Sequence, residues 1–123
     1  MNAPLHREMP GAPAWDAAAA LDQIGRQWDG DIVRRLSDYI AIPAKSLAFD
    51  PDWAAHGFID RVVRDAAQWV ESQKVPGLKL EVVRIDGRTP VIFFEIEGTK
   101  AGAAQTVLMY GHLDKQPEFT GWR

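Results

Sequence analysis

An apolar stripe between residues 15 and 41 is the first long pattern along the chain. Apolar side chains recur there every three or four positions, the spacing of one face of an α-helix. Pro43 disfavours helical geometry at the residue before it, so this helix should end near Ala41. Gly25 and Gly30 each cost about 1 kcal/mol relative to alanine, which predicts a bend or a later start. The stripe comprises Leu21, Ile24, Trp28, Ile32, Leu36 and Ile40.

A second helix is expected after the loop at residues 43–51. Asp52 is a suitable residue to cap its N-terminus, and Pro76-Gly77 should end it. Its apolar positions again follow helical spacing and predict one buried face. That face comprises Ile59, Val62, Val63, Ala66 and Val70.

Three strands are expected in the remaining chain. Residues 78–82 alternate apolar and charged side chains, which is typical of a strand with one buried face. Asp86-Gly87 is a turn signal, so residues 91–96 should pair antiparallel with this strand. Residues 91–94 and 107–110 are continuous apolar runs, which predict strands buried on both faces, the second within a strand at residues 106–110.

Together these elements predict the α/β class, with two helices followed by three strands. A central strand needs neighbours at both edges and helices on both faces of the sheet. Three strands and two helices are too few for that, so we expect the opening part of a mixed sheet. Exposed apolar surface should then appear at residues 91–94 and 107–110.

Composition narrows the function classes. The chain has 123 residues and a formal net charge of -3, which gives no sign of a nucleic-acid surface. It has no cysteine, so any metal site must use histidine and carboxylate ligands. No segment reaches the ~20 apolar residues of a membrane span, and residues 1–14 are expected to form a flexible tail without a secretory signal. Cytoplasmic residence and no membrane partner are therefore expected.

His112 and Asp114 are the candidate site residues. They follow the apolar run 107–110 and Gly111, where an expected strand ends and the backbone can turn. Extended backbone points residues i and i+2 to the same side, so the Asp114 carboxylate can steady the ring of a metal-binding His112. The competing interpretations are a hydrogen-bonded structural histidine and an aspartate that caps a turn.

Other titratable residues are interpreted as surface groups. His56 and Asp60 lie one helical turn apart and are expected to form an exposed pair rather than a metal site. Glu95 and Glu97 are expected to be solvated, and so is Glu118, although it follows the motif closely.

The string Tyr-Gly-His-Leu-Asp-Lys-Gln-Pro at residues 110–117 resembles the first metal-binding motif of a family of dinuclear-zinc metallopeptidases. That family includes carnosine dipeptidase, aminoacylase, acetylornithine deacetylase and succinyl-diaminopimelate desuccinylase, and the string looks most like the dipeptidase branch. Residues 39–46, Tyr-Ile-Ala-Ile-Pro-Ala-Lys-Ser, look like the segment near the start of its catalytic domains. At the position of Lys115, many members of this family carry a small apolar residue instead.

The resemblance implies that residues 15–123 are the N-terminal part of a zinc metallopeptidase catalytic domain, truncated before its remaining ligands. It implies that His112 binds a metal and that Asp114, the candidate catalytic residue, holds its ring. The complete site would hold two Zn ions, with Co or Mn as alternatives. The whole protein, expected to be a homodimer, would hydrolyse the amide bond of dipeptides or N-acyl amino acids, and this fragment alone would be inactive.

Two other functions stay open. One is a non-catalytic truncated module that acts through the open edge of its sheet. The other is a different metallohydrolase that uses a His-x-Asp sequence at a strand terminus.

Overall fold

The computed structural model describes residues 15–98 and 106–121, and it divides the chain into two compact units, Met1–Asp38 and Tyr39–Arg123. The fold combines helices with a small antiparallel sheet, which agrees with part of an α/β fold. The expected N-terminal tail at residues 1–14 lies outside the described residues.

The first helical region has three consecutive parts, α1 (Ala17–Gln27), a π-helical turn η1 (Trp28–Ile32) and α2 (Val33–Ile40). Asp16 caps α1, because its carboxylate accepts a hydrogen bond from the Ala19 amide at 2.9 Å. The end of α2 at Ile40 confirms the boundary that Pro43 predicts. The irregular turn contains Gly30, which agrees with the expected weakness of the middle of this helix.

The apolar stripe of this helix is largely exposed. Leu21 is 72% exposed, Ile24 is 55% exposed and Leu36 is 41% exposed. An amphipathic helix buries its apolar face only against a second element, and the described residues of the unit Met1–Asp38 form consecutive helical segments alone. The periodicity therefore predicted the helix correctly.

The second expected helix is broken into α3 (Trp53–His56) and α4 (Phe58–Ser72). Gly57 separates them with a φ of 69°, a left-handed conformation that glycine adopts without strain. Asp52 occupies the N-cap position of α3, but its side chain makes no capping hydrogen bond. The residues of α4 that are buried are Ile59, Val62, Val63 and Ala67, whereas Ala66 and Val70 are half-buried.

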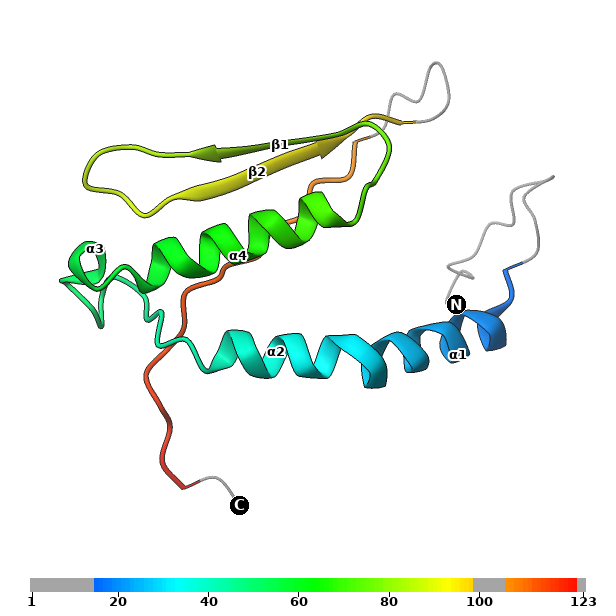
Figure 1. The fold of residues 1–123 in the computed structure, drawn as a ribbon, viewed down its shortest axis with the longest axis horizontal. Coiled ribbons are helices and arrows are strands. Elements are labelled where there is room, and N and C mark those ends of the chain that lie inside the picture. Colours follow the sequence, from blue (N-terminus) through cyan, green and yellow to red (C-terminus); the bar gives the residue numbers. More distant parts are fainter. Residues whose placement is uncertain (1–14, 99–105, 122–123) are drawn as a thin grey trace, which may run out of the picture. The chain divides into compact units, whose positions relative to one another are not determined.

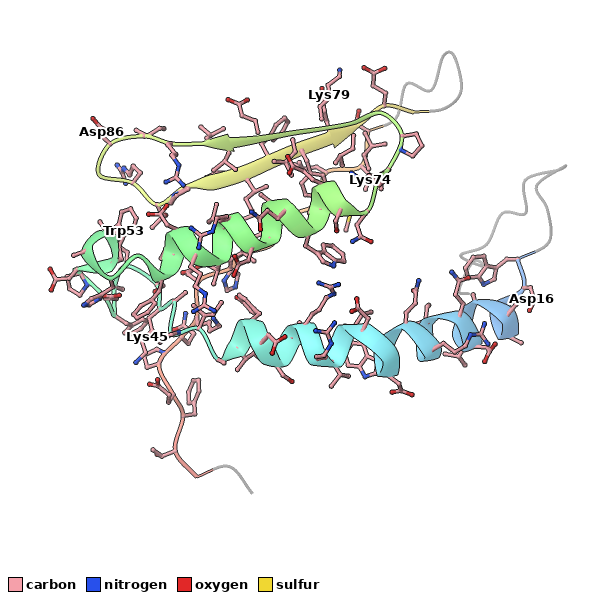
Figure 2. All side chains as sticks on the ribbon, in the orientation of Figure 1. Asp16, Lys45, Trp53, Lys74, Lys79 and Asp86 are labelled. Atoms are coloured by element: carbon pink, nitrogen blue, oxygen red, sulfur yellow. The ribbon has the colours of Figure 1, made fainter. Side chains whose placement is uncertain are left out.

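Strands β1 (Leu78–Val83) and β2 (Val91–Ile96) pair antiparallel, as the sequence predicts. The Arg88 amide donates to the Ile85 carbonyl at 3.0 Å and closes a turn around Asp86-Gly87. Val82 and Ile92 lie opposite each other and pack against the buried cluster on α4, so one face of the hairpin covers this helix (Figure 1). Lys79 extends from the other face (Figure 2).

The third expected strand does not form. Residues 106–110 belong to no strand, and their apolar side chains, Val107 to Tyr110, are 84–90% exposed. A strand needs a hydrogen-bonding partner, and β1 and β2 pair only with each other within the described part of the chain. The run at residues 91–94 is also mostly exposed instead of buried on both faces. The prediction of exposed apolar surface at these two segments is confirmed.

The core of the second unit gathers around the linker that follows α2. Ile42 and Ala44 are 5% and 0% exposed, and they pack with the buried residues of α4. Leu113 packs against the same cluster. The core therefore fixes residues 42–44 and Leu113, the middle residue of the His-Leu-Asp sequence, in one place.

Candidate metal-binding site

Leu113 determines how the two candidate residues are presented. Its side chain packs against the core, while His112 is exposed and Asp114 is half-buried. Neighbouring side chains on an extended backbone point to opposite sides, so burial of Leu113 turns both residues away from the core. The expected i, i+2 arrangement is therefore present, although no strand precedes it.

The His112 ring is braced by Asp114 through its Nδ1 atom. This nitrogen lies 3.2 Å from the Asp114 carboxylate Oδ1 and 3.0 Å from the Asp114 carbonyl oxygen. Both oxygens only accept hydrogen bonds, so Nδ1 has to carry the proton. In the neutral ring this leaves the lone pair on Nε2, the atom available to a metal.

The alternative interpretation of Asp114 as a turn cap is not supported by its contacts. Within residues 15–98 and 106–121, no backbone amide donates a hydrogen bond to the Asp114 carboxylate, and its partner is the His112 ring. The metal role of His112 remains a prediction. No group of three His, Asp or Glu side chains suited to a metal ion occurs in the described parts of the chain.

Residues 113–118 are attached to the segment at residues 39–46. The Lys115 amide donates to the Ala44 carbonyl at 2.8 Å, and the Ser46 amide donates to the Lys115 carbonyl at 2.9 Å. These two bonds form an isolated parallel bridge between Lys45 and Lys115. The Lys45 ammonium group also lies 2.9 Å from the Glu118 carboxylate, so Glu118 is a surface ion-pair partner. Figure 2 labels Lys45 beside this segment.

Two side chains strengthen this attachment. The Lys115 ammonium group donates to the Ile42 carbonyl at 2.6 Å and lies 4.0 Å from the centre of the Tyr39 ring. The Tyr39 hydroxyl donates to the Leu113 carbonyl at 2.5 Å. Burial lowers the pKa of Lys115 below its ordinary value. Burial, and then the negative charge of Asp114, raises the pKa of Tyr39.

Sequence reasoning missed the roles of Tyr39 and Lys115. The sequence did mark both positions. Tyr39 begins one of the two segments that resemble the peptidase family, and Lys115 stands in the other segment, where the family motif often has a small apolar residue. What the sequence could not give is that the two segments touch, since residues 39 and 113 are joined only by tertiary packing.

His56 has a different partner from the one expected. Its Nδ1 lies 2.8 Å from the Asp50 Oδ1, whereas Asp60 forms an ion pair with Arg84 at 2.6 Å. The break at Gly57 between the two helices removes the one-turn spacing on which the expected His56–Asp60 pair depended. The expected pair is therefore wrong. Glu95 and Glu97 are exposed, as expected, and both form ion pairs with Lys79.

A groove of about 490 Å³ lies between α4 and β1, where it is lined by charged residues that include Asp60, Glu71 and Arg84. None of its lining residues comes from the 106–121 segment, so it is separate from the His112 site. None of the helices in the described ranges combines the length and hydropathy that crossing a bilayer requires.

No protein-family model matches the sequence, and a search of curated proteins finds no significant match. The resemblance of residues 39–46 and 110–117 to zinc metallopeptidases therefore stays a hypothesis about the family.

Proposed function

We propose that the chain is part of a metal-dependent hydrolase that cleaves the amide bond of dipeptides or N-acyl amino acids. His112 is the metal ligand in this proposal, and Asp114 holds its ring. The observation that carries it is the contact of His112 Nδ1 with two acceptor oxygens of Asp114, which leaves Nε2 free on an exposed ring.

The attachment of residues 113–118 to residues 39–46 supports the same proposal. The segments whose sequences resemble the peptidase family are residues 39–46 and 110–117, and the backbone bridge between Lys45 and Lys115 holds them together. If the two strings resembled the family only by chance, there would be no reason for the two segments to be in contact.

Zinc, or Co or Mn in its place, would supply a bound water of lowered pKa and would polarise the substrate carbonyl. A catalytic zinc takes three protein ligands as a rule, and His112 is one. In this proposal the 123 residues alone do not hydrolyse substrate, because no three His, Asp or Glu side chains suited to a metal come together in their described ranges. A homodimeric whole protein and a cytoplasmic location are parts of the same proposal.

Substitution of His112 tests the metal role. In the protein that carries a complete site, His112→Ala should abolish dipeptide hydrolysis and reduce the bound zinc, because a direct ligand is lost. The matched control is His56→Ala, which removes an exposed ring paired with Asp50 and should leave both quantities unchanged. Unchanged turnover and zinc content in His112→Ala would refute the ligand role.

Asp114→Ala provides a graded test of the same site. It should weaken zinc binding about tenfold, at the lower end of the range for loss of such a support. The Asp114 carbonyl oxygen remains as an acceptor for Nδ1, which limits the loss. Zinc affinity equal to that of the unsubstituted protein would exclude the bracing role.

A non-catalytic module is the second candidate function. The observation that favours it is the small sheet, in which β1 and β2 pair only with each other among the described residues and offer open edges to a partner strand. This function requires no bound metal. A partner interaction that His112→Ala leaves intact would favour the module over the hydrolase.

A further inference from the structure

Lys115 differs in its surroundings from the other lysines described. Lys79 is an exposed partner of two glutamates on the hairpin. Lys115, in contrast, is half-buried, and its ammonium group meets no carboxylate within the described part of the chain. Its contacts are the Ile42 carbonyl oxygen at 2.6 Å and the face of the Tyr39 ring at 4.0 Å.

A half-buried ammonium group costs free energy unless its contacts compensate. A hydrogen bond from an ammonium group to a carbonyl is stronger than one between two neutral groups. The face of an aromatic ring also attracts a cation. Both contacts of Lys115 are made to residues of one segment, at the end of α2 and just after it. The side chain thus ties its own backbone to that segment.

Tyr39 ties the same two segments from the opposite direction. Its ring lies beneath the Lys115 ammonium group, and its hydroxyl donates to the carbonyl of Leu113. Leu113 and Lys115 flank Asp114 on both sides. The backbone on each side of Asp114 is therefore held by Tyr39, Lys115 or the bridge to Ala44 and Ser46.

We infer that Lys115 is a positioning residue: by clamping residues 113–115 onto Tyr39 and Ile42, it sets the position from which Asp114 braces the His112 ring. The inference rests on the proposed function only for its consequence on metal binding. The clamp itself exists without a metal, so it can be tested in the 123-residue chain alone.

The test compares Lys115→Met, Lys115→Arg and the matched control Lys79→Met by amide hydrogen exchange without metal. The Lys115 and Ser46 amides report the bridge directly. Lys115→Met should speed their exchange about tenfold relative to the amides of β1 and β2, since a charged hydrogen bond is lost. Lys115→Arg should restore protection, because a guanidinium group can donate to Ile42 and stack on Tyr39. Lys79→Met should change neither amide.

The second measurement is the nitrogen NMR signal of the His112 ring, which distinguishes a protonated Nδ1 from a protonated Nε2. A structural role alone leaves this signal unchanged, whereas the positioning role requires a mixture of tautomers in Lys115→Met and the Nδ1–H form in Lys115→Arg. Equal exchange and an unchanged ring signal in Lys115→Met would overturn the inference.

A second variant is needed if Lys115→Met also loses protection in β1 and β2. Tyr39→Phe then replaces Lys115→Met, because this substitution removes only the hydroxyl bond to Leu113. Faster exchange at Lys115 and Ser46 in Tyr39→Phe supports the clamp, and unchanged exchange overturns it.

Zinc titration of the same variants, made in the protein that carries a complete site, separates this inference from the proposed function. If both are correct, Lys115→Met weakens zinc binding about tenfold, as loss of an outer support does, and Lys115→Arg does not. If His112→Ala leaves zinc binding unchanged while the exchange and ring signals respond to Lys115→Met, the proposed function fails and the clamp stands. If zinc binding depends on His112 but is unaffected by Lys115→Met, the clamp's role in positioning the site fails.

Discussion

At the scale of single residues, the described part of the chain contains two imidazoles that each meet an aspartate through Nδ1. His112 contacts an aspartate two positions away on extended backbone, and His56 contacts Asp50 across a loop. The Nδ1 atom of His56 lies 2.8 and 3.0 Å from the two carboxylate oxygens of Asp50. The hydrogen bond to Asp50, the charge of Asp50 and the charge of Asp52 raise the pKa of His56 above its ordinary value of 6.5.

The His56–Asp50 pair should make stability depend on pH in a defined direction. Because the folded-state pKa is raised, the pair contributes fully below pH 6.5, and the contribution is lost as the pH rises through the raised pKa. Asp50→Asn should bring the pKa of His56 back toward 6.5, as measured by NMR titration of its ring. Asp52→Asn is the control and should lower it less. A His56 titration that Asp50→Asn does not move would contradict the pairing.

At the scale of elements, single glycines decide where the helices break. Gly57 adopts a φ of 69° between α3 and α4, and an added Cβ there would meet no atom within 4 Å. The cost of a side chain at Gly57 therefore lies in the backbone conformation alone. Gly25, in the middle of α1, likewise has open space around it but no positive φ. Neither glycine is crowded, so the two differ in backbone conformation and not in the space for a side chain.

Gly57→Ala should lower the free energy of unfolding by about 1 kcal/mol, the cost of a left-handed conformation for alanine. Gly25→Ala should instead raise helix content, since alanine is favoured over glycine by about 1 kcal/mol within a helix. Chemical denaturation and circular dichroism of the two variants measure these effects. Equal stability of Gly57→Ala and the unsubstituted chain would mean that the α3–α4 break does not need a positive φ.

At the scale of the whole molecule, the described residues leave much apolar surface in water. Val107, Leu108, Met109 and Tyr110 are consecutive and almost fully exposed, at 84–90%. Contiguous exposed apolar surface promotes association, whereas isolated apolar side chains such as Ile85, 66% exposed, are ordinary. The run at residues 107–110 is therefore the expected site of self-association.

Leu108→Lys should reduce both the binding of an apolar fluorescent dye and the concentration-dependent light scattering of the chain. The change in the free energy of unfolding should stay within about 0.5 kcal/mol, because the side chain is exposed. Ile85→Lys, which alters a single exposed apolar residue, is the control and should affect dye binding less. A monomer that binds no dye before substitution would contradict the exposure of this run.

Much of the fold could be predicted because its signals are local. The end of α2 before Pro43, the Asp16 cap and the β1–β2 hairpin around Asp86-Gly87 each depend on residues close in sequence. The third strand was wrong for the opposite reason. Residues 106–110 carry the right composition, but a strand forms only where another strand supplies hydrogen bonds.

For the candidate site, the sequence alone determined the His112–Asp114 spacing and, through backbone alternation, that both side chains share one side of the chain. Only the tertiary structure decided that Leu113 anchors this segment in the core and that Tyr39 and Lys115 clamp it to residues 39–46. The physical reason is the range of the interactions. Alternation is fixed by covalent geometry between neighbouring residues, whereas a contact between positions 39 and 115 exists only after the core around Ile42 and Ala44 has brought them together.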